Sequence, residues 1–394
     1  MTKIYETQDK PKKAFLVSII KGDADDESGI KELQGLCETL ELDIITHEKI
    51  RVREKSPKFG MGSGKALELS QKAKELKADL MVFNFNPNPS QQRNWEELSG
   101  IPVVDRQEII IRIFADRATT KEAELQVKLA ELTYFLPRLT HKYIDLSRQR
   151  GGRYGTKGAG ETKLETDRRK IEKRITLLEK EIEQIRKQRQ TQRRQRERGG
   201  IPVCAIVGYT NSGKSSLLNA LTGANVLAED KLFATLDAVT RRFQPAAGVS
   251  VLLTDTVGFI RSLPHSLIKA FRSTLEEAAL ADILIHIIDA SDPNIEINYE
   301  TTLSVLRELG AKDIPMITLL NKIDRLSIIN NEKLTINNEE IAVRNEEFDG
   351  RDVGSLEGLL IRFPGSIAVS VKNNIGLNML KERIALFVKK MNRV

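Results

Sequence analysis

An apolar run from Val203 to Val207 leads directly into Gly208-Tyr209-Thr210-Asn211-Ser212-Gly213-Lys214-Ser215. This stretch matches the pattern G-x-x-x-x-G-K-[ST] in the strand-to-helix setting that the pattern requires. Its glycines allow main-chain N–H groups to converge on phosphate oxygens at the N-terminus of a helix. The pattern therefore predicts an α/β nucleotide-binding domain in which Lys214 lies against the β- and γ-phosphates and Ser215 binds Mg²⁺.

A second Gly-Lys sequence lies nearer the N-terminus, Gly60-Met61-Gly62-Ser63-Gly64-Lys65-Ala66. It lacks both the four-residue gap and the hydroxyl residue after the lysine. We interpret it as a flexible glycine turn before a helix.

Two further segments complete the phosphate side of the predicted site. The apolar strand Val251–Thr254 ends in Asp255-Thr256-Val257-Gly258. An Asp at a strand end can hold Mg²⁺ through water, and a glycine N–H can meet the γ-phosphate. The threonine of Phe233-Ala234-Thr235-Leu236-Asp237 is predicted to complete the Mg²⁺ shell, with Thr240 as the rival candidate.

Base selection is predicted at Asn321-Lys322-Ile323-Asp324, at the end of another apolar strand. The Asp324 carboxylate can accept hydrogen bonds from guanine N1–H and the exocyclic amine, whereas adenine would leave the acid unpaired. The motif therefore predicts GTP as the nucleotide. The strand Ser366–Ser370 is followed by Val371-Lys372, and we expect Ser370-Val371-Lys372 to cover the base; an ordinary sheet end is the alternative.

Phe259 follows Gly258, at the position where many small GTPases have a glutamine that orients the attacking water. We therefore expect slow intrinsic hydrolysis and a macromolecular partner that orders the switches.

The remainder of the chain predicts two more parts. Residues 1–118 alternate apolar runs with helical patterns, which favours an α/β domain with a mainly parallel sheet. Two heptad seams follow, at Leu125, Leu129, Leu132, Leu136 and Leu139 and at Ile171, Ile175, Leu178, Ile182 and Ile185. Because five glycines lie between Gly151 and Gly160, residues 119–199 are predicted to form an antiparallel helical hairpin with a glycine-rich tip.

Pro137 predicts a kink or an early end in the first of these helices. The second is expected from Leu164 to Arg198, and residues 200–394 are assigned to the P-loop GTPase domain.

Charge is concentrated in the hairpin. The net charge of the chain is +7, yet Arg168 to Arg198 alone has 13 Lys/Arg and 5 Asp/Glu. Such a run suits a nucleic-acid partner, although a solvated coiled-coil face is the alternative. No apolar run is long enough to span a membrane and the N-terminus does not resemble a secretion signal, so a cytoplasmic location is expected, with peripheral membrane association left open. Cys37 and Cys204 are expected to be buried, without a disulfide or a metal.

Outside the nucleotide motifs, the chain resembles the HflX family of ribosome-associated GTPases over nearly its whole length. The residues that carry the resemblance are Pro89-Ser90-Gln91-Gln92-Arg93-Asn94, Val104-Asp105-Arg106, Leu136-Pro137-Arg138-Leu139 and Gly158-Ala159-Gly160-Glu161-Thr162-Lys163-Leu164-Glu165-Thr166-Asp167-Arg168-Arg169. P-loop GTPases in general lack the last of these segments.

The resemblance implies that the N-terminal domain and the hairpin bind the large ribosomal subunit and its rRNA. It also implies that GTP binding and hydrolysis are linked to splitting or rescue of stalled or idle ribosomes. Ser215 and Thr235 would then be the Mg²⁺ ligands, and Lys214, Thr235 and Gly258 would serve catalysis. Asn211 also matches GTPases that recruit K⁺. Nothing in the sequence demands a dimer, so a monomer is expected.

This sequence departs from the family pattern at several positions. Arg153 and Tyr154 stand where small residues are usual, and Ala159 stands where proline is usual. Ala238 and Val239 replace Pro-Thr in the switch, and residues 325–363 are longer than usual and are interpreted as a surface insertion.

Two other functions remain open at this point. One is a GTPase acting in ribosome assembly or tRNA modification. The other is an RNA-binding protein in which the nucleotide is only a structural ligand.

Overall fold

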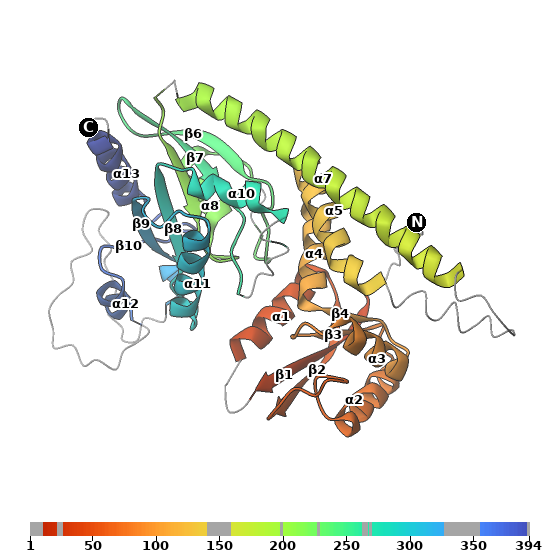
Figure 1. The fold of residues 1–394 in the computed structure, drawn as a ribbon. Coiled ribbons are helices and arrows are strands. Elements are labelled where there is room, and N and C mark those ends of the chain that lie inside the picture. The colour runs from red at the N-terminus through yellow and green to blue at the C-terminus, as the bar shows by residue number, and fades with distance from the viewer. Residues whose placement is uncertain are drawn as a thin grey trace, which may run out of the picture. The chain divides into compact units, whose positions relative to one another are not determined.

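The computed structural model describes residues 11–21, 27–139, 159–197, 200–226, 229–261, 267, 270–326 and 355–391. The chain divides into two compact units, Met1–Ile185 with Pro264–Ala270 and Arg186–Leu263 with Phe271–Val394 (Figure 1). Among the described residues, no helix combines the length and the apolar character needed to cross a membrane.

The first unit is built on a four-stranded sheet in the order β2-β1-β3-β4, with every strand pair parallel. The strands are β1 (Lys13–Lys21), β2 (Asp43–Val52), β3 (Leu80–Phe83) and β4 (Val103–Asp105). The helices between and after them are α1 (Glu27–Thr39), α2 (Ser63–Glu75), α3 (Pro89–Ser99), α4 (Arg106–Arg117) and α5 (Lys121–Phe135). The predicted mainly parallel α/β arrangement is confirmed.

Trp95 lies at the centre of the core of this unit. Its side chain is fully buried, packs against Phe59 and Phe83, and donates from Nε1 to the Phe59 carbonyl oxygen at 3.0 Å. Gly62 is the N-cap of α2 and provides no side-chain cap, so the glycine-rich segment here is a turn that leads into a helix, as predicted.

Pro137 lies where α5 ends. The α-helix ends at Phe135, and a 3₁₀ turn, η1 (Leu136–Arg138), follows it. Proline provides no N–H for a further α-helical hydrogen bond. The predicted early end of this helix is therefore present.

The second predicted helix of the hairpin is α7 (Ala159–Glu197), 39 residues long. It begins five residues before the predicted Leu164. Ala159 and Gly160, predicted as loop, are thus helical: Ala159, Glu161 and Lys163 favour a helix, and one glycine costs only about 1 kcal/mol. The glycine-rich residues 151–158, including Arg153 and Tyr154, lie outside the described residues.

The residues of the second seam are all at least partly buried, as are neighbouring Glu179 and Glu181, and Leu178 is fully buried. The helix therefore has an apolar stripe. Pairing of α5 and α7 as an antiparallel hairpin stays a prediction.

The second unit has a six-stranded sheet in the order β10-β9-β8-β5-β7-β6, parallel except for β6 against β7. Its strands are β5 (Val203–Val207), β6 (Val239–Ala246), β7 (Val249–Asp255), β8 (Ile283–Asp289), β9 (Met316–Asn321) and β10 (Ile367–Ala368). Its helices are α8 (Lys214–Thr222), α10 (Arg272–Ala279), α11 (Ile295–Glu308), η2 (Ile323–Arg325), α12 (Leu356–Arg362) and α13 (Leu377–Met391). The predicted final helix after Gly376 is α13.

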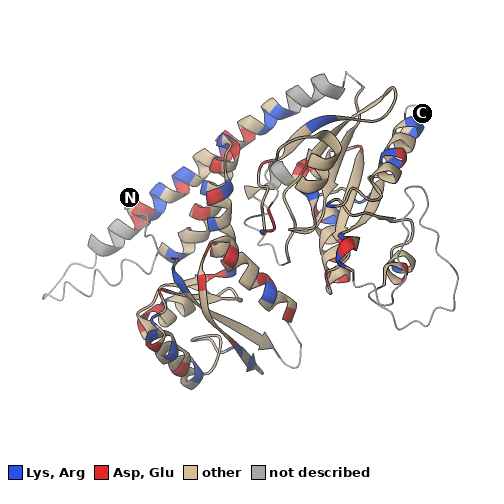
Figure 2. Cartoon of the chain, turned by 180° about the vertical axis from the view of Figure 1, so that it is seen from behind, with Lys and Arg blue, Asp and Glu red and all other residues tan. Residues whose placement is uncertain are grey.

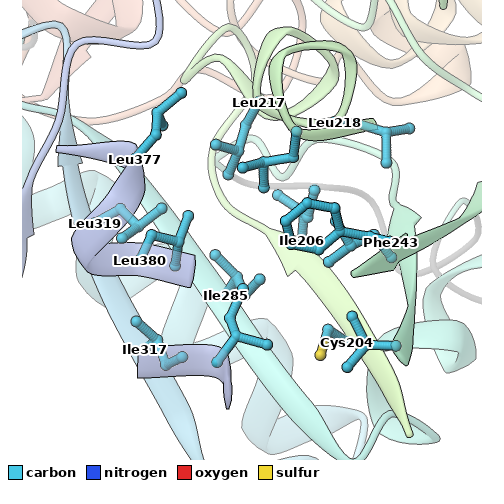
Figure 3. Packing of buried hydrophobic residues seen from close by; sticks show 14 of the residues in the cluster. Cys204, Ile206, Leu217, Leu218, Phe243, Ile285, Ile317, Leu319, Leu377 and Leu380 are labelled. Atoms are coloured by element: carbon cyan, nitrogen blue, oxygen red, sulfur yellow. The ribbon is translucent and has the colours of Figure 1, made fainter. Parts of the chain in front are cut away.

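The core of this unit lies on both faces of the sheet. Ile287 belongs to the cluster that α8 and α13 cover, part of which Figure 3 shows, whereas the next residue, Ile288, packs with Ile295 and Leu359 on α11 and α12. Neighbouring strand residues point to opposite faces, so a continuous apolar strand such as β8 is suited to this central place. The carboxyl ends of β5, β7, β8 and β9 meet at one edge of the sheet. Of the predicted insertion, residues 327–354 lie outside the described residues.

Candidate functional site

The loop between β5 and α8 holds a tight conformation that requires its glycines. Gly208 has φ 154° and Gly213 has φ 101°. A Cβ at Gly208 would collide with the carbonyl oxygen of Ile287, and one at Gly213 would collide with Nδ2 of Asn321. The loop thus lies directly against β8 and β9, with the N-terminus of α8 behind it.

Lys214 is the first residue of α8 and is 6% exposed. Its Nζ donates to the carbonyl oxygens of Tyr209 at 2.7 Å and Gly208 at 3.3 Å. Burial lowers the pKa of Lys214 to about 8, although nearby Asp255 acts in the opposite direction. An anionic ligand at the loop would favour the charged amine.

Three oxygens gather beside Lys214. Ser215 Oγ lies 2.6 Å from Thr235 Oγ1 and donates to Asp255 Oδ2 at 2.7 Å. Asp255 is fully buried at the end of β7, and its Oδ1 has no hydrogen-bond partner. Burial raises the pKa of Asp255, while Lys214, Ser215 and Thr235 lower it. Two hydroxyls and a carboxylate form a hard oxygen donor set of the kind that Mg²⁺ prefers.

Thr240, the rival candidate, lies elsewhere. It is part of β6, and its Oγ1 lies 2.9 Å from Thr254 Oγ1 on β7. Thr235, in contrast, lines the pocket formed by the loop residues, together with Phe233, Ala234 and Gly258. Leu236 is buried and Asp237 is half-buried in the same segment. The structure therefore brings Thr235 and not Thr240 to Ser215.

The segment after β7 lies along the phosphate loop. Phe259 N–H donates to the Gly208 carbonyl oxygen at 3.1 Å, and Thr210 N–H donates to the Phe259 carbonyl oxygen at 2.7 Å. A Cβ at Gly258 would lie 2.8 Å from the main-chain Cα of Thr210 and 2.9 Å from Lys214 Nζ, so a side chain here would require the backbone to shift. Phe259 itself is 1% exposed, and Thr256 and Val257 are also buried.

Asn321 joins the loop to the predicted guanine element. Its Nδ2 donates to the Ser212 carbonyl oxygen at 2.9 Å, and its Oδ1 accepts from Val371 N–H at 3.1 Å. Lys322, with φ 64°, donates from Nζ to the Asn211 carbonyl oxygen at 2.8 Å. The buried Asn321 amide therefore links its own motif to the phosphate loop and to the last predicted loop.

Asp324 lies beside the last predicted loop. It is exposed, as is Lys372, and its Oδ1 accepts from Ser370 Oγ at 2.5 Å. Ile323, the first residue of η2, is half-buried. The Asp324 carboxylate thus stands at the open side of the sheet edge, where a planar base can reach it.

Three residues near this edge were not identified from the sequence. Asp289 ends β8 and forms an ion pair with Lys322 Nζ at 2.8 Å. Asp230 accepts from Asn211 Nδ2 at 2.6 Å, so the side chain that matches K⁺-recruiting GTPases is hydrogen-bonded to an acid. His286 is 1% exposed on β8 and stacks on Tyr299, and burial lowers its pKa to about 3. None belongs to a motif; the only sequence signal is that Asp289 and His286 are polar residues in an otherwise apolar strand.

The first unit contains a separate polar cluster. Arg138 Nη2 lies 3.1 Å from Asp105 Oδ2, and its Nε donates to Gln92 Oε1 at 2.9 Å. The guanidinium lies 3.7 Å from the centre of the Tyr134 ring. Gln92, Asp105 and Arg138 come from three of the four segments that carry the family resemblance, so these segments meet in space.

Comparison with known families gives three adjoining matches. Residues 27–115 match the model described as GTP-binding GTPase N-terminal, residues 117–196 match GTP-binding GTPase Middle Region, and residues 203–322 match 50S ribosome-binding GTPase.

Individual relatives agree with these matches. The chain is 48% identical over 334 residues to a GTPase HflX of Akkermansia muciniphila, covering 82% of this chain and 76% of that protein. It is 40% identical over 326 residues to the GTPase HflX of Escherichia coli, with the same shares covered. A crystal structure described as a complex of SsGBP and GDP is similar in fold, with a TM-score of 0.51 at 24% identity, covering 96% of this chain and 99% of that one.

Proposed function

The chain belongs to the HflX family of GTPases, and from this premise we propose that it binds the large ribosomal subunit and couples GTP binding and hydrolysis to splitting or rescue of stalled or idle ribosomes. The match of residues 203–322 to a model described as a 50S ribosome-binding GTPase supports the partner. In this proposal, residues 1–118 and the hairpin of residues 119–199 contact rRNA, residues 200–394 bind GTP, and the protein acts as a cytoplasmic monomer.

The residues at the carboxyl ends of the strands have distinct roles in binding the phosphates and Mg²⁺. Lys214 would bind the β- and γ-phosphates, and Ser215, Thr235 and Asp255 would hold Mg²⁺. Mg²⁺ would neutralise charge on the phosphate oxygens. The clustered oxygens of Ser215, Thr235 and Asp255 support this assignment, as does the unpartnered Asp255 Oδ1. Gly258 donates its N–H to the γ-phosphate.

Guanine is recognised at the other end of the site. Asp324 accepts from the base, while Asn321 and Lys322 hold the loop that presents it, and Ser370, Val371 and Lys372 flank the base. The bonds of Asn321 to Ser212 and Val371 support this arrangement because they fix the base loop relative to the phosphate loop. Phe259 provides no group that could orient water, so hydrolysis by the protein alone is slow and the ribosome accelerates it.

The observation that best supports binding to the ribosome is the distribution of charge on α7. Lys and Arg alternate with Asp and Glu along its earlier part (Figure 2), where pairs such as Arg168–Glu172 at 2.9 Å and Arg169–Glu165 at 2.7 Å form. From Arg186 to Arg198, in contrast, the sequence has seven Lys/Arg and a single Glu, although Arg186 and Arg189 form ion pairs with Glu276 and Glu277 of α10. Excess positive charge along one helix suits RNA phosphates.

The test measures GTP hydrolysis with and without purified large ribosomal subunits, with Lys214→Ala as the blank. We expect strong stimulation by the subunits that the variant lacks. Stimulation by free tRNA or immature subunits in place of mature ones would support the assembly or modification function. Absence of turnover under every condition would favour nucleotide as a structural ligand.

A further inference from the structure

Tyr209 is the residue of the phosphate loop whose side chain leaves the loop and contacts the segment after Gly258. Its hydroxyl oxygen accepts a hydrogen bond from the main-chain N–H of Arg261 at 2.9 Å. Its carbonyl oxygen accepts from Lys214 Nζ at 2.7 Å. One residue thus contacts both the catalytic lysine and the chain that carries Gly258.

The contact continues a short stretch of parallel pairing. Tyr209 and Phe259 form a β-bridge, in which Phe259 N–H donates to Gly208 O and Thr210 N–H donates to Phe259 O. These bonds fix Phe259, the residue directly after Gly258. The Tyr209 hydroxyl adds a bond two residues further on, at Arg261, and so fixes the direction in which the segment leaves the site.

We propose that Tyr209 is a positioning residue that sets the main-chain N–H of Gly258 for the γ-phosphate. The inference rests on the proposed function of Gly258. The hydroxyl is suited to this role because it reaches the segment without occupying the space beside Gly258, where even a Cβ would lie 2.8 Å from Thr210 Cα and 2.9 Å from Lys214 Nζ. A shift of the segment toward Lys214 is blocked by this packing, and a shift away from it is opposed by the Tyr209–Arg261 bond.

The proposed role of Tyr209 predicts different effects on GTP binding and GDP binding. GDP has no γ-phosphate, so its binding does not depend on the position of Gly258, whereas GTP binding and hydrolysis do. A residue that merely supports the loop would affect both nucleotides equally. The ratio of GTP to GDP affinity therefore separates positioning from support.

The variant Tyr209→Phe keeps the ring and removes only the hydroxyl. We expect GTP affinity to fall about fivefold while GDP affinity stays unchanged, the effect of losing one hydrogen bond, with a fall in kcat of similar size. Titration with fluorescent GTP and GDP analogues and single-turnover hydrolysis measure these quantities, without ribosomes.

Tyr299→Phe is the matched control, since Tyr299 lies on α11 in the same unit and its ring packs against His286 and Phe363. It should leave both affinities and kcat unchanged. An unchanged affinity ratio and kcat in Tyr209→Phe, or an equal loss for both nucleotides, would overturn the inference. Lys214→Ala tests the site itself: if that variant still bound both nucleotides normally, the assignment of the phosphate loop would fail, independently of Tyr209.

Discussion

Asp289 shows how a single side chain outside every motif can support nucleotide binding. Its Oδ2 lies 2.8 Å from Lys322 Nζ, its Oδ1 accepts from the hydroxyl and the N–H of Ser291, and both members of the ion pair are largely buried. The acid therefore holds Lys322 in place for its bond to the phosphate loop.

We predict that Asp289→Asn weakens GTP and GDP binding equally, by about five- to tenfold, because the substitution removes a charge-assisted hydrogen bond on the base side of the site. Equilibrium titration with both nucleotides checks this. A loss confined to GTP would contradict it, and Glu300→Gln, whose exposed ion pair with Arg307 lies on α11, should change neither affinity.

Phe259 replaces the usual glutamine, and its side chain is 1% exposed. We predict that Phe259→Gln does not accelerate hydrolysis by the protein alone. A buried amide without a partner should instead destabilise the unit by about 2–4 kcal/mol.

Hydrolysis rates without ribosomes and thermal unfolding check this prediction, with Phe259→Leu as an apolar control that should lose less stability. A tenfold rise in kcat at unchanged stability would show that the side chain at position 259 reaches the attacking water, contrary to the prediction.

At the scale of elements, the end of α5 is held to β4 and α3 by Arg138. The Asp105 carboxylate is 1% exposed, and burial raises its pKa to about 6, although the N–H of Glu108 and the Arg138 charge lower it. A buried acid with a raised pKa contributes stability at low pH that is lost as the pH rises through about 6.

We predict that Arg138→Gln destabilises the first unit by about 3 kcal/mol at pH 8 and by clearly less at pH 5, where Asp105 is protonated in the variant. Urea denaturation followed by fluorescence reports on this unit alone, because the chain has one tryptophan and Trp95 lies in its core.

The matched control is Lys72→Gln, which removes a more exposed ion pair with Glu48 in the same unit and should cost less than about 1 kcal/mol. Equal losses in the two variants, or a larger loss for Arg138→Gln at pH 5 than at pH 8, would contradict a buried charge pair.

At the scale of the whole molecule, the proposed coupling requires that α7 carry enough positive charge to bind rRNA. Lys173, Lys180 and Lys187 follow each other at seven-residue spacing and are all exposed. We predict that changing these three to Gln weakens binding to large subunits and makes it less dependent on salt. For each phosphate that is no longer neutralised, the slope of log affinity against log salt should fall by about 0.7–0.9.

Sedimentation of the protein with large subunits at several salt concentrations measures the effect. The same change at Lys381, Lys389 and Lys390 of α13 alters the net charge equally and should leave binding nearly intact. If both triple variants bound alike, total charge and not α7 would determine the affinity.

The sequence by itself determined that the chain is an α/β protein with a P-loop GTPase domain. Strand β5 and the start of α8 are where the pattern from Val203 to Ser215 predicts them, because a glycine loop between an apolar strand and a helix has few alternatives. The parallel sheet of the first unit also followed from its apolar runs. Such signals are local, so each can be recognised in a few neighbouring residues.

Only the tertiary structure decided which residues meet. Thr235 and Thr240 were both candidates from the sequence, and the antiparallel pairing of β6 with β7 directs Thr240 to Thr254, away from Ser215. The same holds for Asp289 on Lys322, for the Tyr209 hydroxyl on Arg261 and for Arg138 on Asp105. These contacts join residues 33 to 52 positions apart, and their partners are set by strand order and register, which no local pattern encodes.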